Sequence, residues 1–353
     1  MTRCWLSEHH LAITTEGKVL PCTRYKKRHD APIIHEQKIN DIYNGKWINE
    51  IRYNLQQGEK LDACQKCWQQ EEAGIPSMRQ NYEAEWSSKL KSLEIAFSNH
   101  CNFACRHCSS FSSSKWLDDD IMLGNPTPPA KLMQPSLENY DNLDDIEFVK
   151  MLGGEPLLNK NHSKFLHKLT NIQNVLLEYT TNGSVFPSAD VLDIWHKAKK
   201  VWIEVSLDDI NERFEYFRTH SNFDIVIENC KKFESLQCEK TLGFHIVLNA
   251  LNLPYIYDII KYLQDNFPNW YIYVDKVVVP SWLKTSQWSK SFAQKQISKL
   301  ETLPNTQQVI DTILQECKNN DTNLEEFFDV NSKLDKSRNT DMYQIHTILN
   351  SFR

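Results

Sequence analysis

The chain has 353 residues, which is long for one hydrophobic core and favours a large domain with a smaller one attached. Its 41% hydrophobic and 24% charged residues are ordinary for a globular protein and exclude a disordered chain. The net charge of −6 argues against a dedicated nucleic-acid binder, which usually carries a basic surplus.

The amino terminus and the cysteine content bear on the compartment. Because the first ten residues include Arg3 and Glu8 instead of an apolar run, we expect no secretory signal. No apolar stretch is long enough to span a bilayer, so we expect a cytoplasmic protein without a membrane partner. In that reducing compartment, ten cysteines favour metal or redox chemistry over disulfides. Three scattered cysteines are interpreted as packing residues: Cys230, Cys238 and Cys317.

Residues 1–88 are predicted to form a small amino-terminal module. A short hairpin is predicted over residues 11–20, because apolar residues flank a Glu-Gly turn. Asn40 offers an N-cap for a helix whose apolar residues recur at helical spacing until Gly58. Residues 82–90 are predicted to be a helical linker to the next domain.

From residue 89 to residue 285, predicted strands and helices alternate. The strands are predicted over residues 93–98, 146–152, 175–180, 201–206, 242–249 and 271–279. Helices are predicted between most of them, over residues 161–170, 189–199, 223–236 and 254–266. Such alternation is typical of βαβ units and a parallel sheet, and six strands are too few for an eight-stranded barrel.

The predicted fold class is therefore α/β, with a partial (β/α)6 TIM-like barrel as the core. The cysteine-rich module precedes this barrel, and residues 286–353 are predicted to form a helical carboxyl-terminal extension. The segment Ser109–Tyr140, rich in Ser and Pro, interrupts the alternation after the first core strand. We predict that it is a long functional loop over the barrel mouth.

Three cysteines, the core trio, lie directly after the first core strand: Cys101, Cys105 and Cys108. Functional sites in parallel α/β folds collect at the carboxyl ends of strands. Three thiolates can hold three irons of a [4Fe–4S] cube and leave the fourth iron free for reaction. Zinc is the alternative metal, and it would need a fourth ligand such as His100 or His107.

The Cys-x3-Cys-x2-Cys spacing of the core trio resembles the signature of the radical S-adenosylmethionine (SAM) superfamily. Residues 153–156, Gly-Gly-Glu-Pro at the end of the second core strand, resemble that family's GGEP motif. Many members carry an aromatic residue before the third cysteine, where this chain has His107. The resemblance implies an oxidoreductase that reductively cleaves SAM at the [4Fe–4S] cluster of the core trio. The resulting 5′-deoxyadenosyl radical would abstract a hydrogen atom from a substrate.

The same resemblance implies SAM contacts at the ends of several strands. Glycine lets the backbone approach a ligand closely, and hydroxyls and carboxylates can bind the polar groups of SAM. The residues expected to contact SAM are Gly153, Gly154, Glu155, Asn182, Ser206, Asp208 and Arg218, with Asn249 as an additional candidate. The polar ones can also be interpreted as helix caps, turn residues or surface residues. No catalytic residue is assigned.

The amino-terminal module holds a second set of four cysteines: Cys4, Cys22, Cys64 and Cys67. Four thiolates suit zinc or an iron–sulfur cluster, and their spacing does not choose between the two. The module resembles the auxiliary-cluster module of SPASM/twitch radical SAM enzymes, and residues 334–341 resemble the ending of such proteins. The resemblance implies an auxiliary [4Fe–4S] cluster that accepts an electron from the substrate radical. Trp68 is a candidate for shielding it from solvent.

These patterns together predict a radical SAM enzyme that acts on a peptide or protein, or on a small molecule. SPASM/twitch relatives often act on ribosomal peptides, which favours the first class. An electron donor such as flavodoxin or ferredoxin is implied, and a nucleic-acid partner is not expected. The alternative is a non-catalytic zinc- or iron–sulfur-binding structural or redox-sensing protein. The reaction outcome, whether epimerisation, crosslinking or dehydrogenation, has no signal in the sequence.

Overall fold

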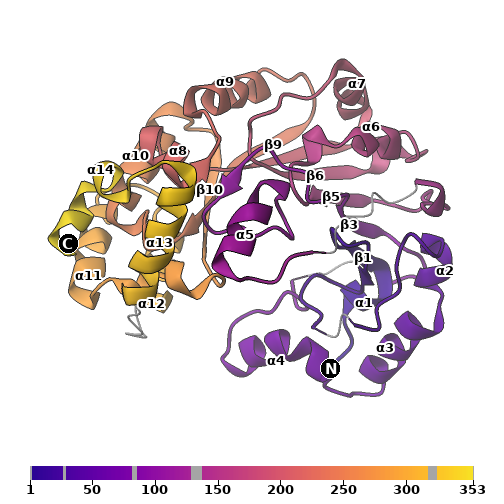
Figure 1. The fold of residues 1–353 in the computed structure, drawn as a ribbon. Coiled ribbons are helices and arrows are strands. Elements are labelled where there is room, and N and C mark those ends of the chain that lie inside the picture. The colour runs from indigo at the N-terminus through magenta and orange to yellow at the C-terminus, as the bar shows by residue number, and fades with distance from the viewer. Residues whose placement is uncertain (1, 27–28, 82–85, 129–136, 317–323, 353) are drawn as a thin grey trace.

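The computed structural model describes residues 2–26, 29–81, 86–128, 137–316 and 324–352. Cys317, interpreted as a packing residue, lies outside these ranges. The described chain folds around one eight-stranded sheet with the strand order β10-β9-β7-β6-β5-β3-β1-β2 (Figure 1). Among the described helices, none combines the length and the apolar character that crossing a bilayer requires.

Six neighbouring strands of this sheet run parallel and form the core of the fold. They are β3 (Ser92–Ala96), β5 (Phe148–Leu152), β6 (Leu176–Thr181), β7 (Lys200–Ser206), β9 (Lys240–Leu248) and β10 (Tyr271–Lys276). All six predicted core strands are confirmed, and with them the α/β partial barrel. The last strand ends at Lys276 instead of Val279, shortly before Pro280, which has no N–H to offer a sheet ladder.

The two faces of the sheet differ in polarity. In β7, Val201, Ile203 and Val205 are fully buried in the main apolar cluster, whereas Glu204 and Ser206 alternate with them. Successive strand residues point to opposite faces, so one face is apolar and the other is polar. The apolar face packs beneath helices α6 (Lys160–Leu166), α7 (Ala189–Lys197), α9 (Phe223–Glu234) and α10 (Ile256–Asn266). These helices confirm the four predicted ones.

The amino-terminal hairpin extends the core sheet at its edge. Strand β1 (His10–Ile13) pairs in parallel with β3, and β2 (Val19–Leu20) pairs antiparallel with β1. This confirms the predicted hairpin and ties the cysteine-rich module to the barrel. The module's helices are α1 (Trp5–His9), α2 (Ile39–Tyr43), α3 (Lys46–Gln56) and α4 (Gln65–Glu72). The domain divisions after residues 88 and 285 stay predictions.

Two helix predictions in this region are wrong. The single helix expected from Asn40 to Gly58 is two helices, α2 and α3, because the chain turns tightly between them. A Cβ on Gly45 would lie 2.9 Å from the Asp41 carbonyl oxygen. Residues 82–85 of the expected linker helix lie outside the described residues, and residues 86–90 are irregular. There the Ser87 hydroxyl accepts the Lys89 backbone N–H, the kind of local bond that competes with a helix.

The segment Ser109–Tyr140 is not simply a loop, because it contains helix α5 (Leu117–Leu123). Its residues 129–136 lie outside the described residues. The carboxyl-terminal extension is helical as predicted, with α11 (Lys290–Leu300), α12 (Gln307–Glu316), α13 (Leu324–Arg338) and α14 (Met342–Ile345). Helix α13 packs against α5, which brings this helix of the extension beside the segment that follows the core trio (Figure 1).

Candidate functional site

The carboxyl ends of the parallel strands surround a cavity of about 410 Å³. This volume falls within the range of small-molecule and cofactor sites. All three cysteines of the core trio line the cavity, as do both glycines of the turn after β5. Of the other predicted SAM contacts, the cavity is lined by Asn182, Ser206 and Arg218. The structure therefore brings together residues that the sequence spreads over more than a hundred positions.

Two short strands fix the position of the central cysteine. Strand β4 (Ala104–Cys105) pairs antiparallel with β8 (Arg218–Thr219), so that Cys105 lies opposite Arg218. Arg218 Nη1 lies 3.5 Å from Cys105 Sγ, and its Nη2 lies 2.7 Å from Asp208 Oδ2. Burial disfavours the guanidinium charge, but Asp208 and Cys105 outweigh that penalty, so the pKa of Arg218 lies above its usual value. A permanent positive charge beside the sulfur favours a thiolate there.

Burial raises the pKa of all three thiols of the core trio, to about 11 for Cys105. Without bound metal these thiols stay protonated at neutral pH, even with Arg218 beside Cys105, so metal binding must release protons. Among the described residues, no three His, Cys, Asp or Glu side chains converge as the ligands of a single metal ion would. A cube gives each thiolate a different iron, so its ligands need not meet at one point. Three thiols on one cavity fit that requirement.

The predicted alternative ligands differ in their surroundings. His100 is exposed and does not line the cavity. His107 does line it, with its ring stacked on Phe217 at a centroid distance of 5.3 Å and its Nδ1 3.9 Å from Asp208 Oδ2. Burial lowers the pKa of His107 to about 4, so the ring is neutral. The imidazole thus provides a flat wall where many family members have an aromatic residue.

The glycine turn after β5 packs directly against the cysteine loop. The N–H of Gly154 donates to the Ser98 carbonyl oxygen at 2.9 Å, and that of Glu155 donates to the His100 carbonyl oxygen at 2.8 Å. A Cβ on Gly154 would lie 2.1 Å from this His100 oxygen, and Gly153 has a φ of +118°. The glycines are therefore needed for contact with the cysteine loop, whether or not a ligand also approaches them.

Glu155 and Asp208 lie behind the cavity wall. Glu155 Oε1 accepts the Thr181 hydroxyl at 2.8 Å, and its Oε2 accepts the Asn182 backbone N–H at 2.7 Å. Burial raises the pKa of Glu155 to about 7. Asp208 is fully buried, and its Oδ1 accepts the Val247 N–H at 2.8 Å. These carboxyl groups connect neighbouring strand ends, and their predicted contacts with SAM stay predictions.

Asn182 and Asn249 have different environments. The Nδ2 of Asn182 lies 3.8 Å from Cys101 Sγ and donates to Asn102 Oδ1 at 3.0 Å. Asn249 is fully buried outside the cavity wall, and its Oδ1 accepts the Leu251 N–H at 2.9 Å within a turn. Asn182 thus faces the core trio, whereas Asn249 stabilises the chain after β9.

Sequence reasoning missed several residues of the site. His245 and Val247 line the cavity from β9, and His245 lies opposite Ser206 in the parallel register. Aligning the ends of these two predicted strands would have indicated His245. Arg106 and Arg338 were also missed, although both are buried beside the cysteine loop. No local pattern marks this pair, because their partners lie far away in the sequence.

The four amino-terminal cysteines gather around a second, smaller apolar cluster. Cys4, Cys22 and Cys64 pack against it, and Cys67 is buried in α4 beside Trp68. Burial, followed by the proximity of the other three thiols, raises the pKa of Cys22 to about 12. Four neighbouring thiols, three of them half-buried and one buried, suit a closed cluster site, in which each thiolate binds a different iron.

Trp68 forms part of the wall around these cysteines. It is buried, and its Nε1 donates to the Leu61 carbonyl oxygen at 3.0 Å. The guanidinium of Arg79 lies 4.8 Å from the centre of its ring and is paired with Glu71. The predicted shielding role of Trp68 is compatible with this position and stays a prediction.

Known proteins resemble the chain over parts of its length. A GTP 3′,8-cyclase of Synechocystis sp. is 24% identical over 191 residues, which cover 51% of this chain and 52% of the cyclase. The radical SAM cyclopropyl synthase TigE of Paramaledivibacter caminithermalis is 24% identical over 194 residues, 51% of this chain and 40% of the synthase. The chain thus matches about half or less of the length of these relatives. The solved structure of native anSMEcpe with bound AdoMet has a TM-score of 0.43 and 15% identity, covering 60% of each chain.

Two family models match separate parts of the chain. Residues 95–263 match the radical SAM superfamily, and residues 4–68 match SPASM, an iron–sulfur cluster-binding domain. The first segment contains the core trio and the cavity, and the second contains all four amino-terminal cysteines. SAM and [4Fe–4S] clusters are the cofactors of these families. Each cysteine set thus lies in the domain whose chemistry requires it, and the chain carries a radical SAM domain over residues 95–263 that follows a SPASM domain over residues 4–68.

Proposed function

We propose that this protein is an enzyme that binds SAM in the 410 Å³ cavity, at a [4Fe–4S] cluster held by Cys101, Cys105 and Cys108. The reduced cluster and SAM, when bound, supply a 5′-deoxyadenosyl radical that abstracts a hydrogen atom from the substrate. One observation carries the proposal: the core trio lines the same cavity as the glycine turn and the polar strand ends. Three thiols beside a cavity of cofactor size leave room for a ligand at the fourth iron.

The residues around the trio stabilise the cluster's thiolates. The Arg218 guanidinium faces Cys105 Sγ, and the Asn182 amide faces Cys101 Sγ. Asp208 keeps Arg218 charged and in place through their ion pair. Hydrogen bonds and positive charge near cluster sulfurs favour the reduced state and so tune the reduction potential. The apolar walls at Phe103 and Val247 limit the access of water.

The amino-terminal cysteines hold an auxiliary [4Fe–4S] cluster. Cys4, Cys22, Cys64 and Cys67 would each bind one iron, which leaves no iron open for substrate. This closed set supports a role in electron transfer, namely accepting an electron from the substrate radical. A flavodoxin- or ferredoxin-type donor reduces the core cluster.

The substrate is a peptide or protein, not a nucleoside triphosphate. A charged layer lies on the polar face of the sheet and comprises Glu94, Lys150, Glu178 and Glu204. The last three each stand two positions before a cavity residue, so they share its face of the sheet. Lys150 is paired with Glu178, which leaves an excess of negative charge. Although GTP 3′,8-cyclases are among the relatives, this charge disfavours a triphosphate, and the SPASM resemblance favours a peptide.

SAM cleavage tests the enzymatic function. Anaerobically reconstituted protein with reductant and SAM should yield 5′-deoxyadenosine, and Cys101→Ala should reduce the yield to background. Cys238→Ser is the matched control, because Cys238 lies outside both cysteine sets and should keep the wild-type yield. A wild-type protein that takes up only zinc, or that never cleaves SAM, contradicts the proposal.

The substrate class needs a separate measurement. The yield of 5′-deoxyadenosine should rise when a peptide encoded beside the gene is added and should stay unchanged with GTP. Mass spectrometry of the peptide should then detect a changed mass. Stimulation by GTP with no effect of peptide contradicts the peptide assignment and leaves the SAM chemistry intact.

A further inference from the structure

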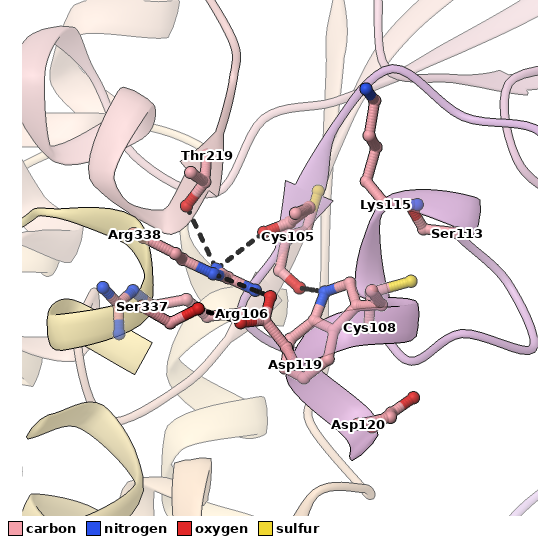
Figure 2. A network of polar contacts seen from close by, with 12 residues as sticks. Cys105, Arg106, Cys108, Ser113, Lys115, Asp119, Asp120, Thr219, Ser337 and Arg338 are labelled. Atoms are coloured by element: carbon pink, nitrogen blue, oxygen red, sulfur yellow. Dashed lines mark hydrogen bonds and ion pairs between the residues drawn. The ribbon is translucent and has the colours of Figure 1, made fainter. Parts of the chain in front are cut away.

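The carboxyl-terminal helix α13 contacts the cysteine loop through a buried arginine. Arg338, the last residue of α13, has a side chain that is 4% exposed. Its Nη2 lies 2.9 Å and its Nε 3.1 Å from Asp119 Oδ2, on α5 (Figure 2). Its Nη1 donates to the Ala104 carbonyl oxygen at 2.8 Å and to the Thr219 hydroxyl at 3.0 Å. One guanidinium therefore joins three separate elements of the core.

The partners of Arg338 are the immediate neighbours of the site residues. Ala104 and Thr219 are paired in the β4–β8 ladder, in register with the pair Cys105 and Arg218. A shift of Ala104 would therefore move Cys105 and its distance to the Arg218 guanidinium. Because the donors of a guanidinium lie in a fixed planar fork, its contacts with Asp119, Ala104 and Thr219 hold these three groups in one arrangement.

A second arginine anchors the same loop from the opposite direction. Arg106, between the second and third cysteines, is fully buried and forms an ion pair with Asp335 of α13. Its Nη1 donates to Asn331 Oδ1 at 2.9 Å, and its guanidinium stacks 3.7 Å from the centre of the Tyr216 ring. The side chain of Arg106 thus extends from the cysteine loop to α13, and the side chain of Arg338 extends from α13 to the loop. A buried charge of this kind is tolerated only when it is fully paired.

Helix α5 completes the connection to the third cysteine. The Ser337 hydroxyl donates to Asp119 Oδ1 at 2.9 Å (Figure 2). In the same helix, Asp120 Oδ2 accepts the Ser110 N–H at 2.6 Å. Trp116 Nε1 donates to the Cys105 carbonyl oxygen at 2.7 Å. These bonds connect α13, through α5 and Trp116, to the backbone at Cys105 and to the segment just after Cys108.

We propose that α13 is a positioning element of the SAM-binding cluster, in which Arg338 and Asp119 fix the backbone at Cys105. Arg106 anchors the same loop to α13. This inference rests on the proposed function, because it takes the core trio as the cluster ligands. The carboxyl-terminal extension therefore supports the cofactor site without lining its cavity, and it lies outside the segment that matches the radical SAM superfamily.

The test compares two charged residues of the same helix in the full-length protein. Arg338→Met removes the donors to Asp119, Ala104 and Thr219. Lys333→Met is the control, because Lys333 forms an exposed i,i+4 pair with Asp329, and such pairs contribute little to stability. After anaerobic reconstitution, one measures the rate of iron loss to a chelator and the EPR spectrum of the reduced protein with and without SAM.

We expect Arg338→Met to lose core-cluster iron about tenfold faster than wild type, the lower end of outer-shell effects on metal affinity. Its SAM-dependent EPR change should be weakened, and Arg338→Lys should restore part of both readouts because it keeps the charge beside Asp119. Lys333→Met should match wild type. A purely structural role would lower the unfolding temperature without changing the SAM-dependent EPR signal.

If Arg338→Met does not fold, Asp119→Asn replaces it, since this variant removes one charge with little change of shape. The inference is overturned if variants at both positions match Lys333→Met in iron loss and in the EPR spectrum. If these variants also cleave SAM at the wild-type rate, the proposed function is unaffected. A wild-type protein without a SAM-responsive cluster overturns both.

Discussion

The two cysteine sets differ in how the chain supplies them. The core trio lies on one loop, residues 101–108, and faces a cavity together with glycine and polar side chains. The amino-terminal set comes from separate elements between Cys4 and Cys67 and packs around an apolar cluster. Ligands on a short loop can occupy one side of a cluster and leave the other side open to a cavity. Ligands from distant elements enclose the cluster and link those elements together.

This contrast assigns different tasks to similar thiols. Under the proposed function, Arg218 and Asn182 tune the open site, because their polar groups face the sulfurs. We infer that the closed site mainly holds its module together, because the four cysteines lie at the start of α1, just after the hairpin and at α4. Variants in each set should therefore fail in different ways.

The largest expected effect is the loss of SAM cleavage in Cys105→Ser. Cys105 is held by β4 and faces Arg218, so its loss removes the central ligand of the open site. We expect 5′-deoxyadenosine at background and about half of the wild-type iron, because each of the two cubes holds four irons. Iron analysis and product quantification check both values. Undiminished SAM cleavage by Cys105→Ser would contradict the assignment of the core trio as cluster ligands.

The next effect is a loss of stability in Cys22→Ser. The auxiliary cluster should be lost, and the free energy of unfolding should fall by roughly 2–5 kcal/mol, the scale of a lost structural cross-link. Cleavage of SAM itself should continue, whereas turnover of the substrate should stop. Chemical denaturation of the reconstituted protein measures the stability. If Cys22→Ser instead abolished SAM cleavage and kept its stability, the contrast between the open and closed sites would be reversed.

Arg218→Lys tests the tuning of the open site. Lysine keeps the charge near Asp208 but loses the second donor directed at Cys105, because its ammonium is a single point charge. The midpoint potential of the core cluster should fall by on the order of 50 mV, where about 59 mV is a tenfold change for one electron. Arg213→Lys is the control, since Arg213 pairs with Asp209 outside the cavity wall. Equal potentials in wild type and Arg218→Lys would remove Arg218 from cluster tuning.

The core sheet and the place of the site could be predicted from the sequence. Regular alternation of strands and helices predicts a parallel sheet, and the carboxyl ends of parallel strands lie at one edge of the sheet. This arrangement places Cys101, Gly153 and Ser206 near one another. The break at Gly45 was missed because the apolar spacing continues across it. The pairing of β1 with β3 was missed because a short hairpin does not specify its neighbour.

The contacts of α13 could not be predicted for a different reason. Arg106 and Asp335 are separated by more than two hundred residues, and each is an ordinary charged residue in its local sequence. Only the packed structure shows that both are removed from solvent. Glu155 is a related case: its motif was recognised, but its bonds to Thr181 and Asn182 depend on how β5 and β6 are aligned.

The smallest expected effect concerns Glu94, in the charged layer beneath the open site. Burial raises the pKa of Glu94 from 4.5 to about 7, although Lys150 partly opposes the shift. Between these values the folded protein retains a proton that the unfolded chain has released, so this group's contribution to stability declines as pH rises through the window. Glu94→Gln should remove that decline and stabilise the protein near pH 8 by at most about 3 kcal/mol.

Urea unfolding of wild type and Glu94→Gln at about pH 5 and about pH 8 measures the difference between their pH profiles. Other buried carboxyl groups, such as Glu155 and Asp209, contribute equally to both proteins and cancel in the comparison. Glu147→Gln is the control, because Glu147 is an exposed carboxylate paired with Lys91. Parallel profiles for wild type and Glu94→Gln would mean that Glu94 is ionised in the folded protein at the same pH as in the unfolded chain. The layer beneath the cavity would then carry a full additional negative charge at neutral pH, which would disfavour a triphosphate substrate still more strongly.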